Sequence, residues 1–146
     1  MARRRILALD VGERRIGLAV SDPLGLTAQG LPTLERRNRR ADLEALAGLG
    51  REYQAGLWLL GLPRHLSGEE GAQAAKVRHW GDALARHTHL PVEYWDERLT
   101  TVEAGRVLRA AGSSRQATRR AIDRLSAVIL LQAYLDASAV AGIVEK

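Results

Sequence analysis

Three acidic residues, far apart in the chain, stand where a carboxylate could do chemistry. Asp10 ends a short apolar run, immediately before a glycine-containing turn. Glu97 closes a later segment that begins at Pro91 and precedes a predicted helix. Asp123 lies inside a predicted helix that is strongly apolar from Ile122 onward, and a buried carboxylate there needs a partner. These three side chains are the candidates for catalysis or metal binding.

Each acid also has a purely structural interpretation. Asp10 could stabilise the turn that follows it, as Asp does in Asx turns. Glu97 could be a surface carboxylate that pairs with Arg98 or lies near a helix N-terminus. Taken alone, Asp10 and Glu97 fit this interpretation better, whereas Asp123 is harder to explain in this way. The cations that could pair with Asp123 are Arg119, Arg120 and Arg124.

The pattern of apolar residues predicts the strands that would position these acids. Segments 5–10 and 15–21 flank the first turn and are typical of a hairpin. In the second segment, Ile16, Leu18 and Val20 share one face. Segment 26–34 is a third strand, whose far end Pro32 restricts to a sheet edge. Two more strands are predicted over 57–60, apolar at every position as burial on both faces requires, and over 91–97.

Helical spacing and capping motifs predict the helices. From about residue 40, apolar residues fall on one helix face: Leu43, Leu46, Ala47 and Tyr53. Three capping boxes, each a Ser or Thr three residues before a Glu or Gln, then predict helix starts. They are Ser67…Glu70, Thr100…Glu103 and Ser113…Gln116. The last helix is apolar nearly all round over 122–135 and should be buried. A hairpin meander followed by strand–helix–strand units predicts an α/β fold, with a five-stranded mixed sheet and helices on both faces.

Such a fold would bring the three acids together. The first and fifth strands would be parallel and would end at the side of the sheet where ligands of open α/β folds bind. The last helix, packed across the sheet, could carry Asp123 toward Asp10 and Glu97. Converging carboxylates need cations, and oxygen ligands without cysteine favour Mg²⁺ or Mn²⁺. Two such ions would provide a metal-bound water as nucleophile and stabilise the leaving oxygen of a phosphodiester.

The composition favours a polyanionic partner. The 146 residues include 22 Lys+Arg against 17 Asp+Glu, for a net charge of +5, and no cysteine. Without cysteine, a disulfide framework, a thiolate zinc site and a cysteine nucleophile are excluded. Nearly all the cations are arginines, whose planar group suits phosphate. We expect a single domain over residues 1–146, soluble and without a membrane span, because no linker divides the chain and no apolar run is long enough.

Four motifs follow one another along the chain. They are Asp10-Val-Gly-Glu-Arg-Arg-Ile-Gly-Leu-Ala-Val-Ser-Asp22, Gly61-Leu-Pro63 with Ser67-Gly-Glu-Glu-Gly71, Asp96-Glu-Arg-Leu-Thr-Thr101, and Ile122-Asp-Arg-Leu-Ser-Ala127. Together they resemble the YqgF/RuvX family of Holliday-junction-resolvase-like proteins, the pre-16S ribosomal RNA nucleases. The resemblance covers nearly the whole chain, and four motifs in register argue against coincidence.

This resemblance implies an RNase H-like fold, a cytoplasmic location and a metal-dependent endonuclease that matures the 5′ end of pre-16S rRNA. By motif, the family's acidic triad falls on Asp10, Glu97 and Asp123, as catalytic residues and ligands of Mg²⁺ or Mn²⁺. Asp96 should point to the opposite strand face from Glu97 and stay outside this group. Resolvases of this superfamily often carry a further acid where this chain has Ser126, which counts against junction-resolving activity.

Four arginines are candidates for contact with structured RNA. Arg14 and Arg98 stand beside the proposed acids, and Arg36 and Arg37 belong to a basic cluster before the first helix. Ordinary solvated charge is the alternative for each.

Two other functions stay open: a resolvase of branched DNA, and a non-catalytic nucleic-acid-binding factor of ribosomal assembly particles. A phosphotransferase of the sugar-kinase type is excluded, because 146 residues leave no room for its second domain.

Overall fold

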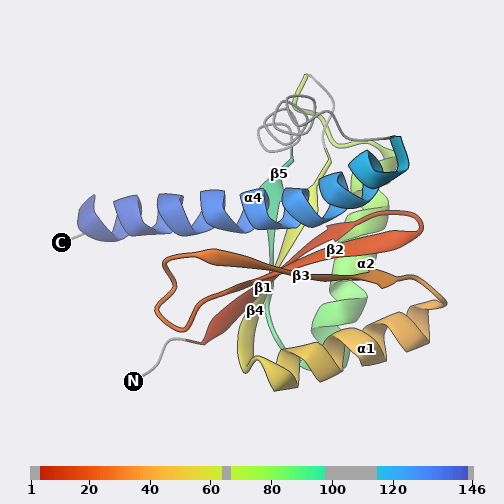
Figure 1. Cartoon of the computed structure of the whole chain (residues 1–146), viewed down its shortest axis with the longest axis horizontal. Helices are drawn as coiled ribbons and strands as arrows, with labels where there is room; N and C mark the ends of the chain where they lie inside the picture. The colour runs from red at the N-terminus through yellow and green to blue at the C-terminus, as the bar shows by residue number, and fades with distance from the viewer. Residues whose placement is uncertain (1–3, 64–66, 98–114, 145–146) are drawn as a thin grey trace.

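The computed structural model describes residues 4–63, 67–97 and 115–144, with the side chains of the last helix described over 125–139. Its strands form one sheet in the order β3-β2-β1-β4-β5 (Figure 1). The strands are β1 (Arg5–Val11), β2 (Arg15–Ser21), β3 (Ala28–Glu35), β4 (Ala55–Leu62) and β5 (Val92–Asp96). β2 pairs antiparallel with both β1 and β3, whereas β1, β4 and β5 run parallel. The predicted five-stranded mixed sheet is confirmed.

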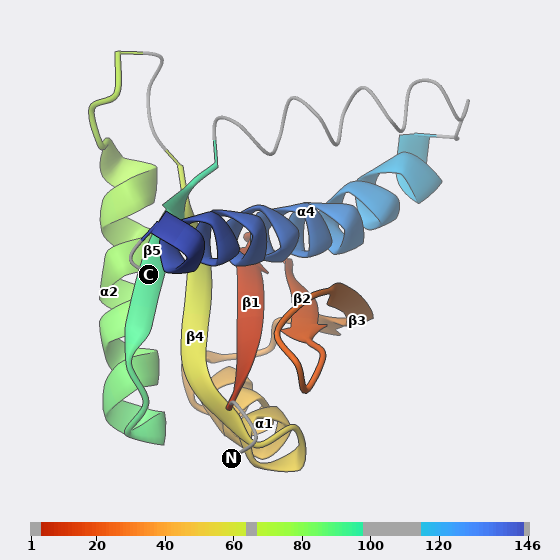
Figure 2. The same ribbon diagram turned by 90° about the vertical axis from the view of Figure 1, so that its left-hand side faces the viewer.

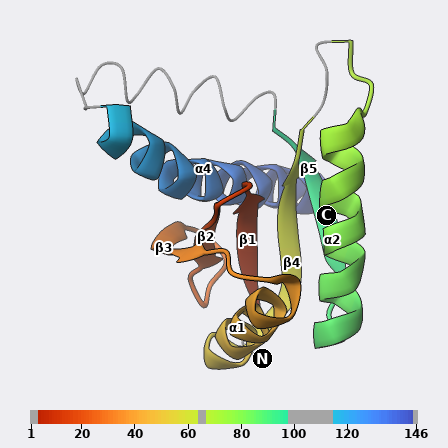
Figure 3. The same ribbon diagram turned by 90° about the vertical axis from the view of Figure 1, so that its right-hand side faces the viewer.

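Helices cover both faces of the sheet, as predicted. Helices α1 (Arg39–Glu52) and α2 (Ala72–Thr88) pack on one face, and α4 (Arg115–Val144) crosses the other (Figures 2 and 3). The larger core lies between the sheet and α1 and α2, where strand residues such as Leu7, Leu9 and Trp58 are fully buried. No described helix is long and apolar enough to cross a membrane.

The face under α4 is built from smaller residues. Ala8 of β1 and Ala19 of β2 are fully buried there, beneath Ala127 and Leu131 of α4. Because side chains of a strand alternate between faces, the small residues of the hairpin fall on one side and the larger ones on the other. Short side chains let a helix axis lie close to the sheet, and α4 contacts β1, β2 and β3.

The edge strand β3 carries Pro32, in agreement with the sequence prediction. A proline cannot donate to a ladder on its N–H side, and only an edge strand tolerates that loss. The other edge of the sheet is β5.

The start of α2 differs from the sequence prediction. The helix begins at Ala72 with Gly71 as its N-cap, and the predicted capping box at Ser67 is wrong. The Ser67 hydroxyl accepts from the Glu69 N–H at 3.4 Å. Glu70 binds Arg78 instead, with Oε2 accepting from Nη2 at 2.9 Å. An ion pair between Glu70, which precedes the N-cap, and Arg78 of the helix thus takes the place of the reciprocal cap. The predicted starts at Thr100 and Ser113 lie outside the described residues.

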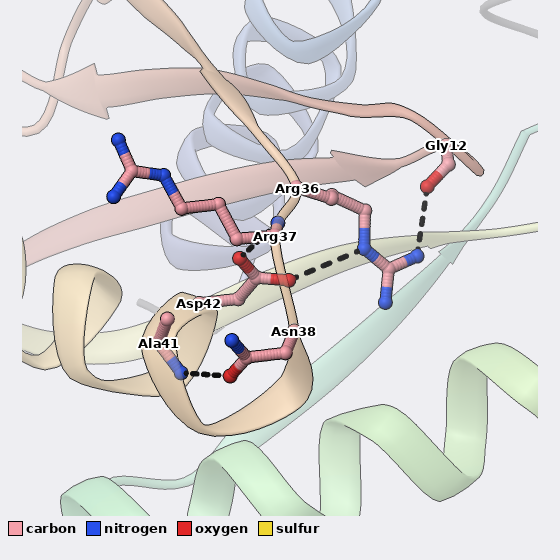
Figure 4. Close-up of polar contacts among 6 residues, drawn as sticks. All are labelled: Gly12, Arg36, Arg37, Asn38, Ala41 and Asp42. Carbon is pink, nitrogen blue, oxygen red and sulfur yellow. Dashed lines mark hydrogen bonds and ion pairs between the residues drawn. The ribbon is translucent and has the colours of Figure 1, made fainter.

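A polar cluster joins the end of β3 to the start of α1 (Figure 4). Asn38 caps α1, its side-chain oxygen accepting from the Ala41 N–H at 2.9 Å. Asp42, 3% exposed, accepts from the Arg37 N–H at 3.0 Å and lies 3.5 Å from Nε of Arg36. A buried carboxylate is tolerated only when paired and hydrogen-bonded, and this cluster meets both conditions.

We predict that Asp42→Ala lowers the free energy of unfolding by about 2 kcal/mol, because it removes the acceptor of a partly buried N–H and the partner of a partly buried arginine. Urea denaturation measures the change. The matched control is Glu44→Ala on the same helix, whose 3.5 Å pair with Arg40 is exposed and should contribute less than about 0.5 kcal/mol. Equal losses for the two variants would contradict a structural role for Asp42.

Candidate active site

Two of the three predicted acids come together at the carboxyl ends of β1 and β5. Asp10 lies near the end of β1, and Glu97 directly follows β5. Strand alternation places Asp10 on the same face as Ala8, which is the face under α4. Trp95 packs with the core beneath α4, so Glu97, two residues later, is on that face as well. Both carboxyl groups therefore point to the α4 side of the sheet.

Strand β4 separates these two strands and offers no side chain at the crossing point. In the parallel ladders, Leu9 pairs with Leu60 and Leu62 pairs with Asp96, which puts Gly61 between the two acids. A Cβ on Gly61 would lie 2.6 Å from Oε1 of Glu97, closer than real Cβ contacts come. The missing side chain lets Glu97 lie across β4, where it hydrogen-bonds the carboxyl group of Asp10.

The environment of Asp10 strongly favours its protonated form. Burial, then the hydrogen bond that the protonated Asp10 carboxyl donates to Glu97, then the repulsion of the Glu97 charge, raise the pKa of Asp10 from 3.8 to about 8. Desolvation penalises the charged carboxylate, and two adjacent carboxyl groups avoid ionising together. The pair thus holds a proton near neutral pH. Two carboxylates that need a positive charge between them are a suitable ligand set for a hard divalent cation.

Asp96 and Glu97 lie on opposite faces. Tyr94 packs in the core beneath α2 and Trp95 in the core beneath α4, so alternation puts Asp96 on the α2 side.

The third predicted acid, Asp123, lies on α4, the helix that crosses the face on which Asp10 and Glu97 meet. It precedes Ala127, which is buried between α4 and the sheet, by four residues, about one helical turn. Its side chain is outside the described part of the structure, as is Arg98. Ser126 is 9% exposed. Among the described side chains, no group of three His, Asp or Glu residues is placed to hold a metal ion.

Arg36 has a role that its sequence position did not indicate. Its Nη1 donates to the Gly12 carbonyl at 2.9 Å, while its Nε lies 3.5 Å from Asp42 (Figure 4). It therefore ties the turn after Asp10 to the start of α1. That turn is tight, since the Gly12 N–H donates to the Arg15 carbonyl at 2.9 Å and a Cβ on Gly12 would lie 2.8 Å from the same oxygen.

The remaining candidate cations are on the surface. Arg14 and Arg37 are exposed, and their backbone groups hold the turn: the Arg14 carbonyl accepts from the Arg36 N–H, and the Arg37 N–H donates to Asp42.

The architecture is that of RuvC-like resolvases, and the fold is therefore RNase H-like. RuvC of Thermus thermophilus, in complex with a Holliday junction substrate, superposes with a TM-score of 0.59 and 12% identity, covering 94% of this chain and 96% of that one. The fowlpox virus resolvase, in complex with Holliday junction DNA, gives 0.53 and 11%, covering 91% and 97%. The chain belongs to the RuvX family, described as Holliday junction resolvase, whose model matches residues 4–137.

Relatives that are more similar in sequence than these resolvases are named as nucleases of ribosomal RNA. A protein of Koribacter versatilis is 52% identical over 132 residues, which is 90% of this chain and 86% of that protein. A protein of Moorella thermoacetica is 52% identical over 132 residues, covering 90% and 94%. Both are named "Putative pre-16S rRNA nuclease".

The role of Gly61 can be tested by adding one methyl group. We predict that Gly61→Ala displaces Glu97 and lowers the pKa of Asp10 part of the way toward its ordinary range, because the hydrogen bond and charge of Glu97 are removed while burial remains. A carbon-detected NMR titration of the Asp10 carboxyl measures this. Gly48→Ala is the control, since a Cβ there meets only Arg51 Nη2 at 3.9 Å. If the Asp10 carboxyl titrates in Gly61→Ala as it does in wild type, Glu97 does not reach Asp10 across Gly61.

The raised pKa of Asp10 also predicts how stability depends on pH without metal. Because the native state holds this proton more tightly than the unfolded chain, its contribution is fully present below pH 4 and is lost as pH rises through about 8. We expect Asp10→Asn to remove this dependence and to stabilise the protein at pH 9 by more than about 1 kcal/mol. Urea denaturation in EDTA at pH 6 and pH 9 gives the comparison. Parallel pH profiles for wild type and variant would contradict the expectation.

Proposed function

We propose that this protein is a metal-dependent endonuclease that processes the 5′ end of pre-16S rRNA during ribosome biogenesis in the cytoplasm. The observation that carries the proposal is the pair of carboxyl groups, Asp10 and Glu97, which meet across Gly61 in a chain of the RuvX family. The names of its relatives support RNA as the substrate.

Asp10, Glu97 and Asp123 would hold Mg²⁺ or Mn²⁺. The donor set fits, since it offers carboxylate oxygens from two strands at one sheet edge, and the raised pKa of Asp10 is the mark of a pair that favours an added positive charge. When bound, divalent cations supply an activated water and stabilisation of the leaving oxygen at a phosphodiester. Asp10 would hold a cation in its ionised form, so the affinity for the cation should rise with pH.

Helix α4 would deliver the third acid. Its contacts with β1 and β2 put it over the face that bears Asp10, and Asp123 precedes Ala127, a buried residue of that contact, by four positions on α4. A ligand on this helix would make the site depend on correct docking of α4 against the sheet.

The arginines would hold the RNA backbone. Arg14 and Arg98 are near Asp10 and Glu97 in the sequence, and Arg36 and Arg37 lie just before α1, where Arg36 contacts the turn after Asp10. Phosphates neutralised by such cations would supply much of the affinity for nucleic acid. Arg36 is committed to Gly12 and Asp42 as well, so its contribution includes keeping the turn after Asp10 in place.

Resolution of branched DNA is a second candidate, supported by resolvase neighbours that were solved with Holliday junctions. Against it stands Ser126, where resolvases of the superfamily often carry a further acid. A ribosome-assembly factor without catalysis is the third. The three functions differ in which substrate, if any, is cut.

Cleavage assays with one preparation distinguish them. We predict that the protein cuts a pre-16S rRNA fragment in Mg²⁺ or Mn²⁺, and that Asp10→Asn and Asp123→Asn each reduce the rate by about 100-fold or more, because a lost ligand removes several kcal/mol of transition-state stabilisation. Asp96→Asn, next to Glu97 in sequence but on the opposite face, is the control and should cut normally.

Equal residual cutting by wild type and Asp10→Asn would exclude the catalytic assignment and favour an assembly factor. Cutting of four-way DNA junctions in preference to RNA would favour a resolvase.

A further inference from the structure

A pocket lies on the face of the sheet that α1 and α2 cover, opposite to the face on which Asp10 and Glu97 meet. It is a pocket of about 530 Å³, within the range of small-molecule sites, between the β1–β2 turn and the first half of α2. Val11 and Gly12 line it, directly after Asp10. Val11 packs with the core beneath α1 and α2, whereas Asp10 is on the face under α4. The pocket and the carboxyl pair therefore share the end of β1 from opposite sides.

The walls of the pocket combine apolar surface with cations. Val77 and Trp80 of α2 provide apolar wall, and Arg36 lies over the Trp80 ring with its Cζ 5.9 Å from the ring centroid. Arg39 and Lys76 provide charge at the rim. Apolar or aromatic surface beside basic groups is the combination with which proteins bind single-stranded nucleic acid.

The cations of the pocket have N–H donors that could bind a ligand. Within the described residues, neither Arg39 nor Lys76 pairs with a carboxylate, and Nη2 of Arg36 has no acceptor. Among the described residues, the side chain of Arg39 makes a polar contact with His79, where Nη1 lies 3.5 Å from Nε2. The described lining includes one acid, Glu13, which is exposed on the turn.

Trp80 supplies an independent observation. It is 7% exposed, and its indole N–H has no acceptor in the described part of the protein. A buried donor without an acceptor is rare, and this one belongs to a residue that lines the pocket.

We propose that this pocket binds one unpaired nucleotide of the RNA substrate, with its base against Val11, Val77 and Trp80 and its phosphate toward Arg39 and Lys76. The inference takes its ligand, RNA, from the proposed function. Proteins recognise RNA mostly at unpaired bases of loops, bulges and ends, because these bases can unstack and enter a pocket. A nucleotide bound in this pocket would contact Val11 and Gly12, so its neighbouring phosphodiester would lie near the end of β1, where Asp10 lies.

Binding measured without divalent metal tests the pocket separately from cleavage. A labelled single-stranded oligoribonucleotide is titrated with protein in EDTA, followed by fluorescence anisotropy at several salt concentrations. The pocket variant is Arg39→Ala/Lys76→Ala. The matched control is Arg40→Ala/Arg86→Ala, which removes the same charge from the same two helices at exposed positions outside the pocket.

We expect the pocket variant to weaken binding about tenfold and to reduce the slope of log affinity against log salt by roughly 0.7 for each phosphate that the protein no longer neutralises. The control variant should bind like wild type. A nucleoside 5′-monophosphate should compete with the oligonucleotide better than the free nucleoside or inorganic phosphate does, because only the nucleotide occupies both the apolar wall and the rim.

Equal weakening by the two double variants would overturn the proposal in favour of diffuse attraction to a basic surface. A mononucleotide that binds in the pocket while oligonucleotide binding ignores the pocket variant would also overturn it, in favour of a free-nucleotide site. Asp10→Asn should bind the oligonucleotide like wild type. If the wild-type protein cuts no RNA in Mg²⁺ or Mn²⁺ while the pocket variant still binds weakly, the proposed function fails and the pocket proposal stands.

Discussion

The central constraint of this structure is the approach of two carboxyl groups across β4, at a position where that strand has a glycine and therefore no side chain. Asp10 and Glu97 come from β1 and β5, which are not neighbours, and Gly61 of β4 leaves the space in which they meet. Bringing two acids together in a partly buried place costs free energy unless a proton or a cation lies between them. The sheet therefore maintains a site that is unfavourable for the metal-free, ionised chain, a cost that is common where function requires it.

The surrounding fold serves to hold that meeting point. The parallel arrangement of β1, β4 and β5 brings their carboxyl ends to one edge. The small residues Ala8 and Ala19 let α4, which contains Asp123, lie close to the face on which Asp10 and Glu97 meet. On the opposite side, Arg36 joins the turn after Asp10 to the buried Asp42 at the start of α1. A disturbance of this cluster should thus reach Asp10 through the turn.

Particular residues show where sequence analysis succeeded and where it did not. Pro32 marked an edge strand, and the alternation of Ile16, Leu18 and Val20 gave the face of β2 that packs in the core beneath α1 and α2, because both effects act within one strand. The capping box at Ser67 failed, since Glu70 finds Arg78 eight residues away and the helix starts at Gly71 instead. Local motifs compete with partners that the folded chain provides, and such partners leave no local pattern.

The sequence by itself determined the mixed sheet, the helices on both faces and the acids at the ends of β1 and β5. These follow from periodicity, turn residues and family motifs, all of which are properties of short segments. Only the tertiary structure decided that Gly61 makes room for Glu97, that Asp10 keeps its proton, and that Arg36 braces the turn. Each of these depends on distances between strands and helices that are remote in the chain, because side-chain contact, burial and charge repulsion exist only once those elements are packed.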